Sequence, residues 1–113
     1  MYKIYHNPRC KKSKDGLDYL SSKTNDFEIV NYLKNGLSID EIKELLLKLH
    51  ISPKELIRVN EEYYKKELKA KQFNDEEWIQ IISENPKLLR RPLIVGKYKA
   101  VIGDPTINIE KLL

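Results

Sequence analysis

The chain has 113 residues, 41% of them hydrophobic and 34% charged, which suits a single folded domain over residues 1–113 and excludes a disordered chain. It contains one cysteine, no leader-like start and no apolar run near the roughly 18 residues that cross a bilayer, so we expect a cytoplasmic protein without membrane contact or internal disulfide. Lys and Arg outnumber Asp and Glu by 21 to 17, and the net charge of +4 favours an anionic partner.

The N-terminal residues predict a β-α-β unit. Residues 2–5 alternate and are rich in strand formers, and Asn7-Pro8 ends this strand. A helix is predicted from Cys10 or Lys11 to about residue 23, because its leucines recur on one face, and residues 27–32 predict a second strand. A strand-helix-strand unit of this length implies parallel pairing and a right-handed crossover.

The middle of the chain is predicted to be helical. Ser38 with Glu41 forms a capping-box pattern, and Asn74 precedes a run of acids as a helix cap does. The predicted helical segments are 38–49, 52–57, about 61–69 and 74–84. The residues predicted to face inward are Ile39, Ile42, Leu45, Leu46 and Leu49 in the first segment and Trp78, Ile81 and Ile82 in the last.

The C-terminal residues predict a β-hairpin followed by a helix. Strands are predicted over 92–95 and 98–102 with a turn at Gly96, which makes them antiparallel, and a last helix over 105–113. The order β-α-β, helices, β-β-α is that of the thioredoxin fold. We therefore predict an α/β, thioredoxin-like fold with a mixed four-stranded sheet and a helical insert at about 38–84.

Cys10 stands where a thiolate is favoured. It follows a strand and a proline and begins a predicted helix, whose unpaired N–H groups and dipole stabilise an anion. Four basic residues lie within 9–14 with no acid between them, and His6 precedes the cysteine by four residues. A lone cysteine is often a buried, inert hydrophobe. These surroundings instead predict a reactive thiol with a lowered pKa.

The residues after Cys10 suggest how it reacts. Backbone N–H groups at the helix start, together with Lys11 and Lys12, could hold an oxyanion while the sulfur attacks it. Ser13 occupies the place of the second cysteine in a CxxC pair; its hydroxyl either supports the thiolate or is a neutral first-turn residue. Any disulfide of Cys10 must be intermolecular, so we expect no bound cofactor but an external thiol such as glutathione.

Other site types are disfavoured. Two histidines and one cysteine cannot complete a structural zinc site within one chain, and no glycine-rich phosphate loop is present. The seven tyrosines fall largely in predicted helices and strands, where packing is the expected role. We therefore predict no metal and no direct nucleic-acid contact.

Three segments resemble one protein family. YHNPRCKKS at 5–13 closely resembles the start of the glutaredoxin-coupled arsenate reductase (ArsC) family. LIRVN at 56–60 and NPKLLRRPLIV at 85–95 resemble two further segments of that family. The motifs occur in the family's order and span essentially the whole chain.

The resemblance implies roles for individual residues. Cys10 matches the nucleophile, His6 the residue that lowers its pKa, and Ser13 the supporting hydroxyl. Arg58 and Arg91 match two of three arginines that hold arsenate and the covalent arseno-cysteine. The implied activity is a thiol oxidoreductase acting on an oxyanion or a disulfide, with glutathione and glutaredoxin or another thiol protein as partners.

Two further positions follow from the same resemblance. Pro92 matches a proline that is cis and faces the nucleophile in thioredoxin-like proteins. The third arginine is missing, because Gly103 or Asp104 stands before the matching Pro105. An aspartate there would repel arsenate, and Lys97 or Lys99 could replace the arginine's bidentate fork only in part.

A regulatory branch of the same fold provides the alternative function. Spx-type transcriptional regulators bind the RNA polymerase α subunit and sense oxidation, commonly through a CxxC pair. Ser13 in place of the second cysteine argues against such an internal switch. An arsenate reductase-like enzyme is therefore the predicted function, and an Spx-type regulator is the alternative.

Overall fold

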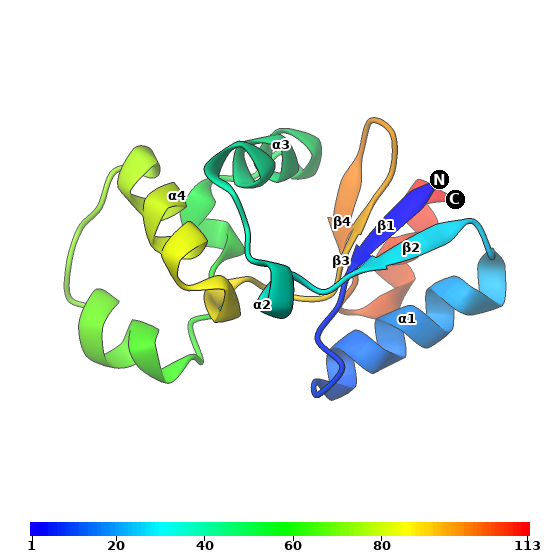
Figure 1. The fold of residues 1–113 in the computed structure, drawn as a ribbon, viewed down its shortest axis with the longest axis horizontal. Coiled ribbons are helices and arrows are strands. Elements are labelled where there is room, and N and C mark those ends of the chain that lie inside the picture. The colour runs from blue at the N-terminus through cyan, green and yellow to red at the C-terminus, as the bar shows by residue number, and fades with distance from the viewer. The chain divides into compact units, whose positions relative to one another are not determined.

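The computed structural model describes residues 1–113, which form two compact units (Figure 1). Met1–Asn35 and Arg91–Leu113 make the first unit, and Gly36–Arg90 makes the second. The second unit contains the predicted insert and extends beyond it at both ends. No helix in either unit has both the length and the apolar character that a membrane span requires.

The first unit is built on a mixed four-stranded sheet. Its strands lie in the order β2-β1-β3-β4, where β1 is Tyr2–Tyr5, β2 is Phe27–Val30, β3 is Leu93–Val95 and β4 is Ala100–Ile102. Strand β1 pairs in parallel with β2, and β3 pairs antiparallel with both β1 and β4. The predicted β-α-β unit, the C-terminal hairpin and the α/β fold class are thus confirmed.

Helix α1, Lys11–Lys23, and the C-terminal 3₁₀ segment Thr106–Leu112 lie on the same side of this sheet (Figure 1). Between them and the strands is a core of fully buried residues: Ile4, Leu20, Ile94 and Ile109. The hydroxyl of Tyr2 donates a hydrogen bond to the carbonyl of Leu112 at 3.0 Å, which joins the two ends of the chain. Burial of this apolar cluster is what holds α1 against the sheet.

Helix α1 approaches the segment before β3 unusually closely. A Cβ placed on Gly16 would lie 2.4 Å from Cγ of Pro92, which is far inside van der Waals contact. The Arg91–Pro92 peptide bond is cis, as the family resemblance implied, and the Asp104–Pro105 bond is cis as well. Glycine at position 16 therefore allows α1 to lie directly against Pro92.

We expect Gly16→Ala to destabilise the protein by about 1–3 kcal/mol, the usual cost of overpacking a core. In an exposed helix the same change would stabilise by about 1 kcal/mol, so packing and helix propensity predict opposite signs here. Urea unfolding measures the difference. Ser22→Ala, on the exposed face of the same helix, is the matched control and is expected to cause little change or a slight gain. A more stable Gly16→Ala protein would contradict the close packing.

The second unit consists of helices. It contains α3 (Ile39–Leu49), 3₁₀ turns at Pro53–Leu56 and Pro86–Leu88, a π-helical segment at Tyr64–Leu68, and α4 (Asp75–Glu84). Ser38 forms the predicted capping box at the start of α3. Asn74, predicted as a helix cap, forms a capping box at the start of α4. The side chains that these two helices bury are Ile42, Leu45, Leu46, Trp78, Ile79 and Ile82. Ile79 rather than the predicted Ile81 is thus buried in α4.

The predicted boundaries are wrong at several elements. Strand β2 ends at Val30, and Tyr32 begins a short helix, α2 (Tyr32–Asn35). Asn31 causes this change, because its carbonyl accepts from the N–H of Asn35 at 2.9 Å and its side-chain Oδ1 accepts from Lys34 N–H at 3.2 Å. The helix predicted at about 61–69 is a shorter, π-helical segment, Tyr64–Leu68. The helix predicted at 105–113 is a 3₁₀ helix, Thr106–Leu112.

Candidate active site

A tight turn places Cys10 at the start of α1. The Asn7 carbonyl accepts from Cys10 N–H, and Asn7 Oδ1 accepts from Arg9 N–H, both at 3.0 Å. Cys10 is the N-cap residue, with φ −104° and ψ 125°, and its carbonyl accepts the first helical hydrogen bond from Lys14 at 3.0 Å. The half-buried thiol therefore lies at the positive end of the helix, as predicted.

The surroundings of the thiol lower its pKa. Burial raises the pKa of Cys10, but the backbone N–H of Ser13, the positive charge of Arg91 and the backbone N–H of Lys12 lower it by more. A hydrogen bond from the Arg91 side chain adds to the lowering, so the net pKa lies below that of an ordinary cysteine. Backbone donors at a helix start and one guanidinium thus favour the thiolate.

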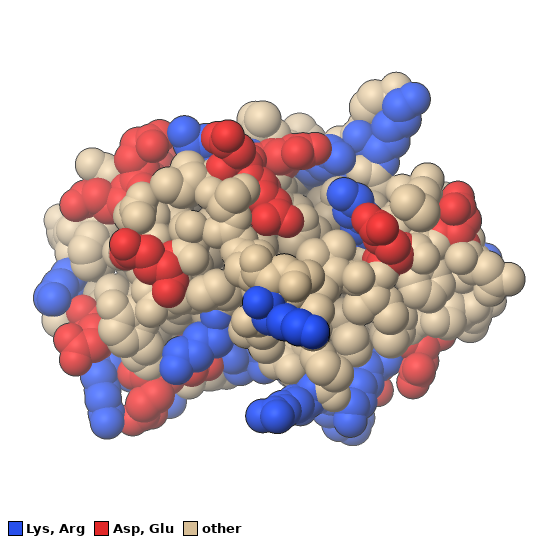
Figure 2. All heavy atoms as spheres, viewed as in Figure 1, with Lys and Arg blue, Asp and Glu red and all other residues tan.

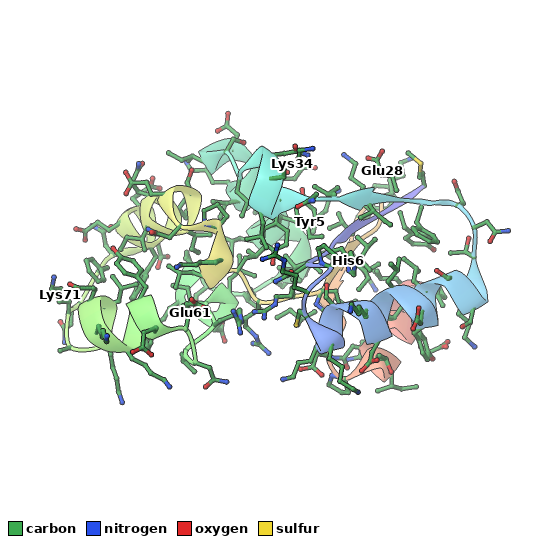
Figure 3. The ribbon with its side chains drawn as sticks, turned by 60° about the horizontal axis from the view of Figure 1, so that its bottom comes forward. Tyr5, His6, Glu28, Lys34, Glu61 and Lys71 are labelled. Carbon is green, nitrogen blue, oxygen red and sulfur yellow. The ribbon has the colours of Figure 1, made fainter.

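His6 and Ser13 act on each other and on the loop. His6 lies at the end of β1, next to Tyr5 (Figure 3), and its Nδ1 is 2.9 Å from Ser13 Oγ. The same oxygen accepts a hydrogen bond from Asn7 N–H at 2.9 Å. Burial lowers the pKa of His6 despite a hydrogen bond with the Ser13 backbone that raises it, so the imidazole is neutral at pH 7. In this arrangement the Ser13 hydroxyl holds the loop, while its backbone N–H faces the thiolate.

We expect the rate of Cys10 alkylation by iodoacetamide to show a pH midpoint below that of an unassisted cysteine, roughly 8.5. The thiolate is the reacting form, so a lowered pKa moves the rise in rate to lower pH. Mass spectrometry of samples quenched over time measures the rates, and the chain's single cysteine makes them unambiguous. A midpoint at or above the ordinary value would contradict the thiolate assignment.

The two lysines predicted to bind substrate are both paired with carboxylates. Lys11 Nζ is 3.3 Å from Asp15 Oδ2, one helical turn away. Lys12 Nζ is 3.0 Å from Asp104 Oδ2, which follows β4. All four side chains are substantially exposed, so these ion pairs are weak and an incoming anion could compete for the lysines. Their role in substrate binding stays a prediction.

Two buried polar side-chain atoms have no hydrogen-bond partner. They are the hydroxyl oxygen of Tyr32 and Nε of Arg91, and no other buried side-chain nitrogen or oxygen in the chain lacks a partner. The pKa of Tyr32 is raised to about 12, chiefly by burial; the charge of Arg91 opposes this rise and that of Cys10 adds to it. Tyr32 follows β2, whose Val30 carbonyl accepts from His6 N–H at 3.1 Å, at the edge of the sheet where the loop to Cys10 begins.

Arg58 belongs to the second unit. Its Nη1 is 2.8 Å from Glu61 Oε2, in the least exposed ion pair of the chain. Its backbone N–H donates to the Leu88 carbonyl at 2.7 Å, and Arg90 N–H donates to the Leu56 carbonyl at 2.9 Å. This short antiparallel contact holds the backbone on both sides of Arg58. Its predicted role in holding the substrate stays a prediction.

The structure distinguishes Gly103 from Asp104, the two residues that precede Pro105. Gly103 N–H donates to the Pro92 carbonyl at 2.8 Å. A Cβ on Gly103 would lie 2.6 Å from Cδ1 of Ile94 and 3.0 Å from Cγ of Pro92, so no long side chain fits there. Asp104, in contrast, has a substantially exposed side chain that reaches Lys12, so a longer side chain has room at this position. Which of the two residues replaces the family's arginine stays a prediction.

Two residues that the structure draws attention to, Tyr32 and Gly16, were not predicted as site residues. The sequence predicts Tyr32 at the end of a strand, and nothing in its sequence context shows that its hydroxyl lacks a partner. Gly16 and Gly103 both pack against Pro92. A signal existed for Gly16, because a glycine in the middle of a predicted helix usually has a packing reason.

The site offers no evident metal ligands. No group of three or more His, Cys, Asp or Glu side chains is arranged to hold a metal ion. The face drawn in Figure 2 carries both basic and acidic side chains rather than one broad basic area. The groups that the structure brings to the Cys10 thiol are Arg91 and the backbone N–H donors of Lys12 and Ser13.

Comparison with known proteins identifies the family. The model of the ArsC family matches residues 5–112. An arsenate reductase of Neisseria meningitidis is 34% identical over 98% of this chain and 97% of its own length. The Escherichia coli protein YfgD is 40% identical over 98% of this chain and 95% of its own. The structure of an arsenate reductase from Vibrio cholerae is 31% identical, with a TM-score of 0.93 over 99% of this chain and 97% of that one. This chain belongs to the ArsC family.

Proposed function

We propose that this protein is an arsenate reductase in which Cys10 is the nucleophile. The observation that supports this most directly is the position of the Cys10 thiol, with its lowered pKa, at the start of α1 and beside Arg91. Relatives of the whole chain bear the name arsenate reductase, and their identity to it is 34%. A disulfide substrate would use the same thiolate, but the unpartnered Arg91 Nε–H is a donor suited to an oxyanion.

The reaction balances with one external thiol. The Cys10 thiolate bonds to arsenic, and one arsenate oxygen leaves as water after taking up protons. A second thiol, which we propose to be glutathione, then forms a disulfide with Cys10. The two electrons released by disulfide formation reduce As(V) to As(III), and arsenite leaves. Because Cys10 is the only cysteine, a further thiol protein such as glutaredoxin must reduce the mixed disulfide.

The protein groups have separate roles in this scheme. The N–H groups of Lys12 and Ser13 and the Arg91 guanidinium stabilise the thiolate before attack. During attack, negative charge develops on the arsenate oxygens, and in this proposal Arg91, whose side chain interacts with Cys10, stabilises that charge. His6 and Ser13 keep the loop in position through their mutual hydrogen bond and through Asn7 N–H.

A coupled assay tests the proposal. The protein is incubated with arsenate, glutathione, glutaredoxin, glutathione reductase and NADPH, and NADPH consumption is followed. We expect turnover with the natural chain and none with Cys10→Ser, whose oxygen is a poor nucleophile at neutral pH. Equal NADPH consumption by the two proteins would contradict the proposal. No turnover, together with binding to the C-terminal domain of the RNA polymerase α subunit, would instead favour the regulator hypothesis.

A further inference from the structure

Tyr32, just beyond the carboxyl end of β2, carries an unused hydrogen-bond donor. Its side chain is completely buried, and its hydroxyl has no hydrogen-bond partner. A buried hydroxyl without a partner loses its hydrogen bonds to water and gains none in return, so folded proteins rarely contain one without a reason. The other such atom in this chain is Nε of Arg91, a residue that contacts Cys10.

The ring of Tyr32 is held in place by local structure. Tyr32 begins α2, directly after the Asn31 turn that ends β2. Its ring packs on that of Tyr5, with centroids 6.3 Å apart and planes tilted by 40°. The ring therefore has a fixed position. Tyr32 follows the carboxyl end of β2, where the Val30 carbonyl accepts from His6 N–H at 3.1 Å, so it lies at the same edge of the sheet as the loop that carries Cys10.

The chemistry of this hydroxyl suits an oxyanion. Burial keeps the phenol protonated, because its pKa is raised to about 12, so at neutral pH it is a donor rather than an anion. The Arg91 Nε–H is likewise a free donor. A tetrahedral oxyanion bonded to the sulfur presents several acceptor oxygens, which can satisfy both donors at once. Such donors are fixed before the substrate arrives. They are also shielded from water, and this shielding strengthens the hydrogen bonds that they make.

We propose that the Tyr32 hydroxyl donates a hydrogen bond to an oxygen of the oxyanion held at Cys10, alongside Arg91 Nε, and is thus a substrate-binding residue of this site. This inference rests on the proposed function only in requiring that the site bind an oxyanion.

Protection of Cys10 from alkylation tests the inference without turnover. The rate of iodoacetamide labelling is measured against increasing inorganic phosphate, and in parallel against arsenate with no added thiol, which gives a dissociation constant for each anion. We expect Tyr32→Phe to weaken both by about tenfold to a hundredfold, the usual effect of losing a hydrogen bond to a charged group. The pH midpoint of labelling without anion should not change, because the hydroxyl makes no hydrogen bond to the sulfur.

Tyr2→Phe is the matched control. Tyr2 donates to the Leu112 carbonyl, so its loss should lower the melting temperature and leave anion binding unchanged. Tyr32→Phe should keep or raise the melting temperature, because it removes an unpartnered buried group. Unchanged anion binding in Tyr32→Phe, or a lower melting temperature, would overturn the inference alone. No protection of the natural chain by either anion would overturn both the inference and the oxyanion function.

Discussion

Arg91→Gln is expected to raise the pKa of Cys10 and to lower kcat/KM for arsenate by about a hundredfold to a thousandfold, as the loss of one preorganised donor to a developing oxyanion does. The physical reason is that Arg91 stabilises two anions in succession. In the free protein its charge and hydrogen bond lower the pKa of the thiol. During attack its free Nε–H and its charge are available to the substrate.

The variant Arg91→Lys separates these two contributions. Lysine keeps the positive charge but lacks the planar fork that holds two oxygens at once. We therefore expect Arg91→Lys to retain most of the lowering of the Cys10 pKa and still lose much of the turnover. The alkylation profile and the coupled assay measure the two quantities independently. If the pH midpoint of Cys10 alkylation in Arg91→Gln equals that of the natural chain, the guanidinium does not stabilise the thiolate.

Asp104→Arg is expected to raise kcat/KM for arsenate by about tenfold to a hundredfold, the range of one added charge-assisted hydrogen bond. The substitution removes a carboxylate that would repel the substrate. It also frees Lys12, whose Nζ lies 3.0 Å from the Asp104 carboxylate. Both side chains are substantially exposed, so loss of this ion pair should change the free energy of unfolding by less than about 1 kcal/mol. The coupled assay measures the effect.

Two comparison variants make this prediction specific. Asp104→Asn removes only the negative charge and should give a smaller, few-fold gain of the kind expected for one exposed charge interaction. Gly103→Arg should destabilise the protein instead, because even a Cβ at this position would meet Ile94 and Pro92. Equal activity of Asp104→Arg and the natural chain would mean that residue 104 does not face the bound oxyanion.

Some features of the candidate site could be predicted from the sequence, and others could not. Cys10 at the start of a helix follows from Asn7-Pro8 and the leucine spacing after it, and the structure confirms this placement. The Ser13 hydroxyl was predicted either to support the thiolate or to be a neutral first-turn residue, and in the structure it interacts with His6 Nδ1 and Asn7 N–H. The loop conformation decides which partners the hydroxyl has, and sequence spacing alone does not specify that conformation.

The basic cluster shows the same limitation. Within 9–14 no acid interrupts the positive charges, which made all of them appear available to an anion. The fold brings Asp104 to Lys12 from ninety-two positions away, and helix periodicity brings Asp15 to Lys11. Counting charges along a segment therefore overstated the free positive charge near Cys10.

The order of strands and helices, the thiol at a helix start and the membership in a family were determined by the sequence itself, because each depends on residues within a few positions of one another or on a matched motif. The tertiary structure alone decided which donors beside the thiol remain without partners, why residue 103 admits no side chain, and which lysines are paired. Those features arise where segments distant in the chain meet, and their energies depend on distances of a few ångström that no local pattern specifies.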